Sequence, residues 1–306
     1  MTINNLAARC RCCGETGRLQ DLGFIGEVAP FFLRRVAGMR LGASLSASRW
    51  KRTVQRIVQA AVGLLARVYK PTALVEIQIC DSCLFVQTKL PFYEDAINRL
   101  YADYREESYN RERIAYEPGY ARIAPDVGHS QTELHTRLSG SGKFLKAHIP
   151  ATEDFTILDF GGSDGKFMPQ LNGRKYVFEI SMVEPVAGVT RIHSETELGT
   201  YSLVQLAHVV EHVVEPLALV KHVATKVADG GYLYIETPEE ASDADRPLLR
   251  AGELRILIHE HINRFCVQSV TRLVESAGLR LVAIEAEPVD VGWATSVHIR
   301  ALGQKC

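Results

Sequence analysis

The sequence predicts an α/β protein whose C-terminal half is a doubly wound sheet with an antiparallel final strand. Three observations predict this fold. From about residue 150, apolar runs of strand length alternate with segments of helical spacing, as in parallel sheets. A glycine-rich turn, 161–165, directly follows the apolar run 155–160, so a ligand can approach the backbone there. Two last apolar runs, 281–286 and 296–301, flank a Pro/Gly loop and predict an antiparallel pair.

Length and charge limit the class of protein. The 306 residues suggest two domains, and 35 Lys+Arg against 36 Asp+Glu leave a net charge of −1. This balance argues against a globally basic nucleic-acid binder. No apolar run approaches the roughly 18 residues that cross a bilayer, and the first residues lack the apolar core of a signal peptide. We expect a soluble, cytoplasmic protein, and the sequence leaves its oligomeric state open.

Two cysteine pairs predict a metal site near the N-terminus. Cys10 and Cys13 form one C-x2-C pair, and Cys80 and Cys83 form another. In a reducing compartment such pairs indicate a metal rather than disulfides. Four thiolates suit tetrahedral Zn²⁺ and leave no open position for chemistry, so we expect a structural zinc. Cys12 is an alternative to Cys10 in the ligand set.

Both pairs belong to one predicted zinc-binding module, residues 1–92, which an insertion interrupts. Apolar runs at 74–79 and 84–87 predict strands on either side of the second pair. The insertion, 27–70, carries nine Lys/Arg and one acidic residue. Its apolar positions from 54 to 68 recur with helical spacing and predict a basic amphipathic helix. Such a helix either has a solvated basic face or contacts a membrane surface or an anionic partner.

Tyrosine and arginine are concentrated in the next segment, predicted as a helical region and linker over 93–143. Tyr101, Tyr104 and Arg105 would share one face of a helix. Because these side chains recognise sugars and phosphates by stacking and forked hydrogen bonds, they are candidate substrate-binding residues. The alternative is a helix that packs its aromatic side chains on the next domain. Residues 129–142 are polar, contain Gly and Ser, and predict a loop or linker.

Acidic residues mark the first two strands of the C-terminal sheet. Asp159 lies near the end of the first strand, and Glu179 lies 20 residues later, near the end of a second strand predicted at 176–180. An acid at this distance accepts hydrogen bonds from ribose hydroxyls. A helix is predicted to begin at Lys166, directly after the glycine turn.

His208 is the first candidate for a general base. It ends a strand predicted at 203–208, and open α/β sheets bind ligands at the carboxyl ends of their strands. An imidazole also titrates near neutral pH. His212 follows on the next helical turn, either as a second functional residue or as a buried structural histidine. The acidic run 236–245 predicts a solvated loop rather than a metal site.

Four motifs of this half resemble those of class I S-adenosylmethionine-dependent methyltransferases: LDFGGSDGKF, LAHVVEHVVEP, VADGGYLYIETP and HEHINRFCVQSVTRLVESAGL. The resemblance implies a Rossmann-like domain that binds S-adenosylmethionine, over residues 144–306. It implies that Asp159 lies near the methionine end of the cofactor and that Glu179 holds the ribose. Ser163 stands where a glycine is common in the family. The cofactor-binding set so implied is Asp159, Gly161, Gly162, Ser163, Gly165 and Glu179.

The N-terminal module resembles the zinc-binding domain of sugar C-methyltransferases from deoxysugar biosynthesis. The Tyr/Arg segment followed by this core also resembles proteins found among surface-polysaccharide biosynthesis enzymes. In the sugar C-methyltransferases a Glu-His pair takes part in base chemistry, which implies catalytic roles for Glu260 and His261. The resemblance thus implies methyl transfer to oxygen or carbon of a sugar, nucleotide sugar or related small molecule.

Two other functions fit parts of the sequence. A non-catalytic binding or scaffold protein would keep the cofactor fold and dock through the basic insertion. A nicotinamide-dependent oxidoreductase would also use a glycine turn, but its usual pattern is G-x-G-x-x-G, whereas this turn reads D-x-G-x-S-x-G. The turn therefore argues against the oxidoreductase.

Overall fold

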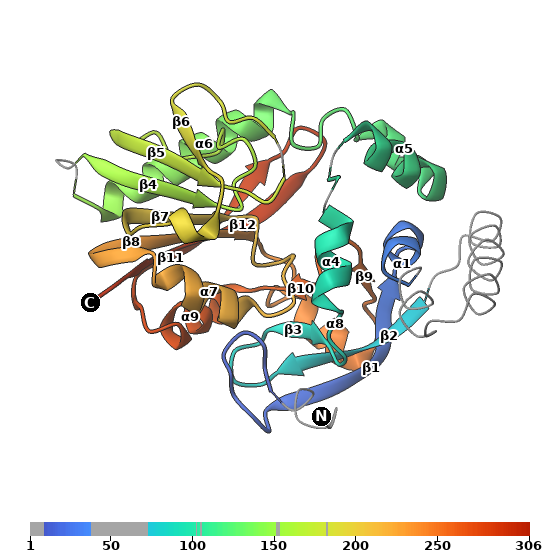
Figure 1. Cartoon of the computed structure of the whole chain (residues 1–306). Coiled ribbons are helices and arrows are strands. Elements are labelled where there is room, and N and C mark those ends of the chain that lie inside the picture. The colour runs from blue at the N-terminus through green and yellow to red at the C-terminus, as the bar shows by residue number, and fades with distance from the viewer. Residues whose placement is uncertain (1–8, 38–72, 102, 105, 151–153, 182) are drawn as a thin grey trace, which may run out of the picture.

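Two sheets organise the chain (Figure 1). The computed structural model describes residues 9–37, 73–101, 103–104, 106–150, 154–181 and 183–306. The helix predicted at 54–68, most of the basic insertion and the candidate Arg105 lie outside these residues. Within them, no helix is both long enough and apolar enough to span a bilayer.

The larger sheet has the strand order β11-β12-β8-β7-β4-β5-β6. Its strands are β4 (Phe155–Phe160), β5 (Gly173–Phe178), β6 (Val189–Ile192), β7 (Tyr201–Ala207), β8 (Val227–Pro238), β11 (Arg280–Asp290) and β12 (Thr295–Gln304). Strands β4 to β8 pair in parallel, whereas β12 is antiparallel to both β8 and β11. The predicted α/β fold with an antiparallel final strand is confirmed. Strand order reverses between β4 and β7, the kind of position at which open α/β sheets bind ligands.

Helices bury both faces of this sheet (Figure 1). Helix α6 (Gln131–His148) covers one face, and α7 (Pro216–Ala224) and α9 (Val267–Ser276) cover the other. Leu203 of β7 belongs to the hydrophobic cluster that contains Phe144 of α6. The next residue, Val204, belongs to the cluster that contains Val220 of α7. Alternate side chains of one strand thus enter opposite cores, because a strand points successive side chains to opposite faces.

The linker predicted at 129–142 is wrong, because most of it belongs to α6. Ser130 caps the helix, its Oγ accepting a hydrogen bond from the Glu133 backbone N–H at 3.2 Å. The glycines that suggested a loop are helical. A Cβ on Gly140 would lie 2.3 Å from the Arg300 guanidinium, so this glycine makes room for a buried side chain of β12.

The helix predicted to begin at Lys166 is also wrong, because turns fill the connection from β4 to β5. The whole connection, 161–172, has only about the dozen residues that the shortest crossovers need, and the glycine turn 161–165 takes up the first part of it. Pro169 lies in the middle of this short segment and could not donate a helical hydrogen bond. The glycine turn therefore leads directly into the second strand.

The smaller sheet has the order β10-β3-β2-β1-β9. Its strands are β1 (Leu19–Val28), β2 (Ala73–Cys80), β3 (Val86–Thr88), β9 (Ile256–Ile258) and β10 (Asn263–Arg264). Strand β9 pairs in parallel with β1, and β10 pairs antiparallel with β3. Residues of the C-terminal half therefore complete the N-terminal sheet, and the β9–β10 loop, which carries Glu260 and His261, lies where the two halves meet.

The other helices of the described residues near this sheet and the connection to α6 are α1 (Pro30–Ala37), α4 (Glu94–Tyr101), α5 (Glu107–Tyr116), α8 (Asp245–Ala251) and the short 3-10 helix η2 (Pro118–Arg122). A second 3-10 helix, η3 (Glu195–Glu197), connects β6 to β7 of the larger sheet. Helix α4 ends at Tyr101, so Tyr104 lies in the following turn rather than on the predicted helix face. The Tyr101 and Tyr104 rings still meet edge to face, with centroids 5.1 Å apart.

Candidate active site and metal centre

The glycine turn after β4 has the backbone conformation that its sequence requires. Gly161, Ser163 and Gly165 all have left-handed φ angles, of 75°, 54° and 76°. Ser163 adopts the same left-handed region as Gly161 and Gly165, although this region is unfavourable for most residues other than glycine. A Cβ on Gly162 would lie 2.1 Å from Cγ of Asp159, so only glycine allows the turn to lie against this carboxylate.

Asp159 is a buried acid with few partners. The residue is only 1% exposed, and neither carboxylate oxygen has a hydrogen bond of good geometry among the described residues, although the neighbouring Gln205 side chain lowers its pKa. Burial has the larger effect and raises the pKa of Asp159 to about 7. A ligand that brings a cation or N–H donors to this point would satisfy both oxygens. The α-ammonium of a methionine moiety is such a group, in agreement with the role implied for Asp159.

Glu179 lies on the side of the turn 161–165 opposite to Asp159. It follows β5 directly, and its carboxylate accepts hydrogen bonds from the backbone N–H groups of Ser163 and Ser181, each at 3.0 Å. Asp159 and Glu179 thus flank the turn from neighbouring strands, at the carboxyl edge of the sheet. The buried acid and the glycine that admits no Cβ fit an adenosyl amino-acid cofactor.

His208 lies at the end of β7, the strand next to β4. It has a left-handed φ of 57°, which is unusual for histidine, and its backbone N–H donates to the Glu236 carbonyl at 2.8 Å. Nδ1 lies 3.1 Å from Oε1 of Glu211. Nε2 has only longer contacts, 3.4 Å to Glu236 and 3.4 Å to His298. Nδ1 of the ring therefore faces the Glu211 carboxylate, and Nε2 faces Glu236 and His298 at longer distances.

Glu236 is buried, so the prediction of a solvated loop is wrong for this residue. It lies near the end of β8, and the sequence could not show its arginine partners, which come from α6 and β12. Arg137 of α6 donates to Oε1 at 2.7 Å, and Tyr234 donates to Oε2 at 2.7 Å. Nε of Arg300 lies 3.4 Å from Oε2. Burial opposes ionisation, but Arg137, His208 and His298 keep the pKa of Glu236 well below its usual value.

Glu260 is surrounded by the Tyr/Arg segment. Tyr109 donates to Oε1 at 2.5 Å, Arg113 donates to the same oxygen at 2.7 Å, and the Tyr104 hydroxyl lies 3.4 Å from Oε2. Burial would raise the pKa of Glu260, but Arg113 and the other neighbours lower it to about 2. A carboxylate this acidic and this well paired is a weak proton acceptor. Glu260 therefore contacts the Tyr/Arg segment, and its hydrogen bonds hold the side chain in place.

His212 and His261 lie together beside Glu211, with ring centroids of the two histidines 4.9 Å apart. The Tyr101 hydroxyl contacts Nδ1 of His212 at 2.9 Å and donates to the Glu260 carbonyl at 2.7 Å. The predicted substrate residue Tyr101 therefore supports this cluster. Glu211 was missed by the sequence analysis as a site residue, although the H-x-x-E-H spacing of 208–212 was visible in the printed sequence.

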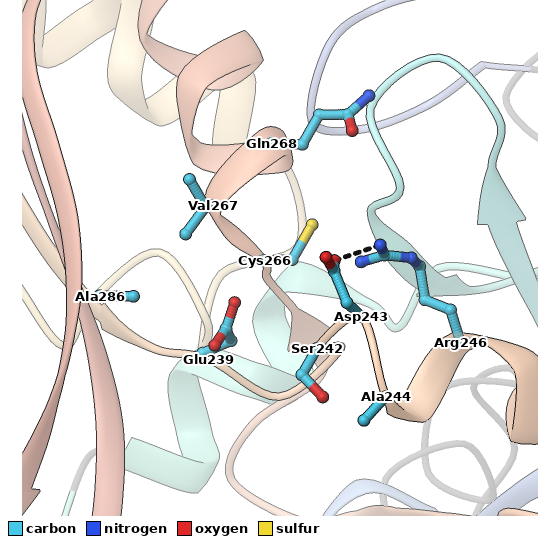
Figure 2. A pocket seen from close by; sticks show the side chains of 9 residues that line it. All are labelled: Glu239, Ser242, Asp243, Ala244, Arg246, Cys266, Val267, Gln268 and Ala286. Carbon is cyan, nitrogen blue, oxygen red and sulfur yellow. Dashed lines mark hydrogen bonds and ion pairs between the residues drawn. The ribbon is translucent and has the colours of Figure 1, made fainter.

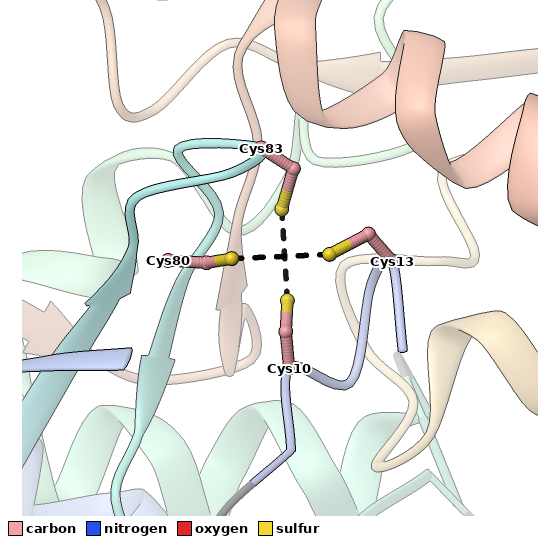
Figure 3. Close-up of side chains that lie close together, drawn as sticks. All are labelled: Cys10, Cys13, Cys80 and Cys83. Atoms are coloured by element: carbon pink, nitrogen blue, oxygen red, sulfur yellow. Dashed lines mark hydrogen bonds between the residues drawn. The ribbon is translucent and has the colours of Figure 1, made fainter. Parts of the chain in front are cut away.

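Four cysteines converge in the N-terminal module (Figure 3). Cys10, Cys13, Cys80 and Cys83 are buried, and their Sγ atoms lie within 4.8 Å of one another. The separations of 3.6 Å for Cys10–Cys83 and 3.8 Å for Cys13–Cys80 exclude disulfides and match the roughly 3.8 Å expected between thiolates about 2.3 Å from one tetrahedral Zn²⁺. Cys12 is turned away, its Sγ donating to the Ser269 carbonyl at 3.2 Å.

A surface cavity of about 390 Å³ opens just beyond β8 (Figure 2). Its lining comes from the segment after β8, from the start of α9 and from β11, and includes Glu239, Ser242, Gln268 and an Asp243–Arg246 ion pair. The cavity is thus polar and follows the carboxyl end of a strand that neighbours β7.

Comparisons with solved structures give methyltransferases of low identity. A Burkholderia thailandensis 1,6-didemethyltoxoflavin-N1-methyltransferase is 14% identical, with 64% of this chain and 90% of that chain covered and a TM-score of 0.43. Magnesium protoporphyrin IX methyltransferase from Synechocystis PCC 6803 is 13% identical (66% and 100% covered, TM-score 0.44). A Leishmania major SAM-dependent methyltransferase is 16% identical (59% and 76% covered, TM-score 0.44).

A search of curated proteins found no match. A family model described as a methyltransferase domain matches residues 91–284, which is more than half of the chain. This range contains the glycine turn, both acids that flank it, and His208. The chain therefore belongs to this methyltransferase family and is an S-adenosylmethionine-dependent methyltransferase.

Proposed function

We propose that this enzyme methylates oxygen or carbon of a sugar, nucleotide sugar or related small molecule, with His208 as general base. One observation carries the proposal: His208 lies at the carboxyl end of β7, next to the glycine turn of β4, with Nδ1 facing Glu211 and with only long contacts at Nε2. This arrangement orients an imidazole and leaves one nitrogen for a proton that comes from the acceptor.

Each of these residues has a separate role in the proposed methyl transfer. The bound cofactor supplies an electrophilic methyl group. Asp159 accepts hydrogen bonds from its amino-acid end, Glu179 accepts them from its ribose, and the turn 161–165 allows close approach of the backbone. Nε2 of His208 would take the proton of the acceptor as the acceptor–methyl bond forms and the sulfur–methyl bond breaks, with S-adenosylhomocysteine as the leaving group. The adjacent carboxylates of Glu211 and Glu236 would stabilise the imidazolium.

The other candidates have supporting roles in this proposal. Glu260, held by Arg113 and Tyr109, positions the β9–β10 loop, and His261 is the second candidate for the base. Tyr101 and Tyr104 border the acceptor site, Tyr101 through its contact with His212, and Arg105, outside the described residues, stays a candidate acceptor-binding residue. The tyrosine hydroxyls and the polar groups that line part of the cavity beyond β8 suit a hydroxylated acceptor such as a sugar.

We also propose that Cys10, Cys13, Cys80 and Cys83 hold a structural Zn²⁺. The thiolate spacing and the complete burial of the group support this assignment. All four ligands come from the protein, so the metal would have no open position for the reaction.

Calorimetry with S-adenosylhomocysteine tests the cofactor assignment, and labelled S-adenosylmethionine with a panel of sugars, sugar phosphates and nucleotide sugars tests the acceptor. We expect stoichiometric binding of the demethylated cofactor and transfer of label to one class of acceptor. Titration with NADH is the matched control and should give no heat. Folded protein that binds NADH but not S-adenosylhomocysteine would refute the proposal. Cofactor binding with label transferred only to non-sugar acceptors would refute the sugar assignment alone.

A further inference from the structure

A second cluster of metal-ligand type lies beside His208 and has no part in the cofactor site or the cysteine group. It contains Glu211, His212 and His261, whose ligand atoms lie within 4.8 Å of one another. We propose that these three side chains bind a divalent first-row transition cation. The proposal concerns binding and does not depend on which acceptor is methylated.

Glu211 needs a positive charge that the described residues do not supply through Lys or Arg. The residue is 0% exposed, and its only ion-pair neighbours there are histidines, with His208 Nδ1 at 3.1 Å and His212 Nε2 at 3.9 Å. Oε1 receives no hydrogen bond of acceptable geometry. The other buried acid at this edge, Glu236, has two arginines instead. A buried carboxylate without such partners is costly unless a proton or a cation lies against it.

The hydrogen bonds of His212 aim a lone pair at Glu211. The Tyr101 hydroxyl donates to the Glu260 carbonyl, so its oxygen is left to accept from Nδ1–H of His212, 2.9 Å away. Nδ1 also lies 2.9 Å from that carbonyl, which can only accept. Nδ1 therefore carries the proton, and Nε2 presents a lone pair toward a carboxylate oxygen. Two facing lone pairs repel one another unless a cation lies between them.

The outer contacts of the cluster have the pattern found around metal ligands. Nδ1 of His261 lies 3.0 Å from Oε2 of Glu240, which leaves Nε2 for a metal. The second oxygen of Glu211 accepts from Thr237 Oγ1 at 3.1 Å. Metal-binding histidines typically donate their other N–H to a carboxylate or carbonyl, and ligating carboxylates are themselves hydrogen-bonded. Each of the three side chains has such a partner.

The backbone holds the two ligand-bearing loops together. The Glu211 carbonyl accepts hydrogen bonds from the N–H groups of Ile262 at 3.0 Å and Asn263 at 3.2 Å. The Asn263 side chain donates to the carbonyls of Val210 at 3.0 Å and Val213 at 2.6 Å. The loop after β7 and the β9–β10 loop are therefore fixed against each other before any cation arrives.

The ligand chemistry selects the class of cation. Two imidazoles and one carboxylate suit Zn²⁺, Co²⁺, Mn²⁺ or Fe²⁺ better than Mg²⁺ or Ca²⁺, which prefer oxygen ligands. Three protein ligands leave positions open. His212 and His261 are partly exposed, with side-chain exposures of 17% and 29%, so the open positions face the solvent side of the site.

Titration of the zinc-loaded protein with Co²⁺ tests the proposal, because absorption spectra separate the two kinds of site. Cobalt at the cysteines gives thiolate charge-transfer absorption, whereas cobalt at Glu211, His212 and His261 gives only weak d–d bands. We expect one Co²⁺ per chain without the thiolate signal. Glu211→Gln should remove this binding, and Glu240→Gln should weaken it about tenfold through His261.

Glu215→Gln is the matched control, since Glu215 lies on the same loop but pairs with Arg9 at the surface; its Co²⁺ affinity should equal that of the wild type. His261→Asn is a second ligand variant in case Glu211→Gln does not fold. Wild-type protein that takes up Co²⁺ only with the thiolate signal, or ligand variants that bind it as tightly as wild type, would overturn the proposal. In that result a protonated histidine balances Glu211.

Discussion

At the scale of single residues, the chemistry depends on acids whose surroundings differ sharply. Neither carboxylate oxygen of Asp159 has a hydrogen bond of good geometry among the described residues, and burial raises its pKa to about 7. Glu260 is also largely removed from solvent, but Arg113 and other neighbours lower its pKa to about 2. The first group is available for a ligand and the second is not. The surroundings of these two acidic residues thus suit Asp159 to ligand binding and Glu260 to positioning.

The unusual pKa of Asp159 predicts a pH-dependent cost in the cofactor-free protein. The folded-state pKa of about 7 exceeds the unfolded value of about 3.9. Stability is therefore greatest at low pH and is lost as the pH rises through 7. Relative to Asp159→Asn, the wild-type free energy of unfolding should fall by about 2 kcal/mol between pH 5.5 and 8, as measured by urea denaturation.

The exposed acid Asp154 provides the control, because Asp154→Asn should show no such pH trend. Calorimetry should find that Asp159→Ala no longer binds S-adenosylhomocysteine. If the stability difference between wild type and Asp159→Asn is the same at both pH values, the buried carboxyl is not the cause.

Replacement of His208 separates cofactor binding from turnover. His208→Ala should bind S-adenosylhomocysteine with nearly unchanged affinity, since the ring does not contact the glycine turn, and should lower kcat by a factor of about 10² to 10⁴. His129→Ala is the control at an exposed histidine. Full activity in His208→Ala would transfer the base assignment to His261.

At the scale of elements, buried ion pairs tie α6 to strands β8 and β12 of the larger sheet. Arg137 of α6 and Arg300 of β12 both reach Glu236 near the end of β8. Arg300 also passes against Gly140 of the same helix. Because Glu236 approaches His208, this buried ion network also fixes one wall of the active site.

Removal of one arginine from this network should destabilise the protein strongly. Arg137→Met leaves Glu236 with a poorly compensated buried charge, so the free energy of unfolding should fall by about 3–5 kcal/mol in a denaturation experiment. The surface pair Arg111–Glu107 offers a control, since Arg111→Met should change the free energy of unfolding by less than about 1 kcal/mol. Adding Glu236→Gln to Arg137→Met should recover part of the loss. An Arg137→Met loss no larger than the control's would show that the network is dispensable.

At the scale of the whole molecule, the N-terminal module and the methyltransferase core share one interior. The cysteine group lies in the same hydrophobic cluster as Leu217 of α7 and Val270 of α9. Strands β9 and β10 then complete the N-terminal sheet from the C-terminal half. The two parts should therefore unfold together rather than as independent domains.

Loss of the proposed zinc should therefore affect the whole chain. Elemental analysis should find one zinc per chain bound at the cysteines, and Cys83→Ser should lose it. The unfolding temperature should then fall by at least about 10 °C in a single transition. Cys306→Ser, at an exposed cysteine, should change neither quantity. A metal-free protein with unchanged stability would contradict the assignment.

The sequence by itself determined the strands of the larger sheet other than β6, the glycine turn and the spacing of the cysteine pairs, because each depends on residues close together in the chain. Alternating apolar runs specify buried strands, and a turn in the left-handed region needs glycine or a residue that tolerates it, as Ser163 does here. Prediction from the sequence failed where a local pattern results from a contact with a distant residue. The glycines of α6 suggest a linker, but Gly140 is needed because Arg300 packs against it.

Only the tertiary structure decided which acids are paired and which lie together with histidines. Arg113 is 147 residues from Glu260, and His212 and Glu211 meet His261 across some fifty residues of chain. Such contacts depend on how β9 and β10 join the N-terminal sheet, and no periodicity in the sequence encodes that pairing. Burial and neighbouring charges, which set the pKa of each acid, exist only once these segments have come together.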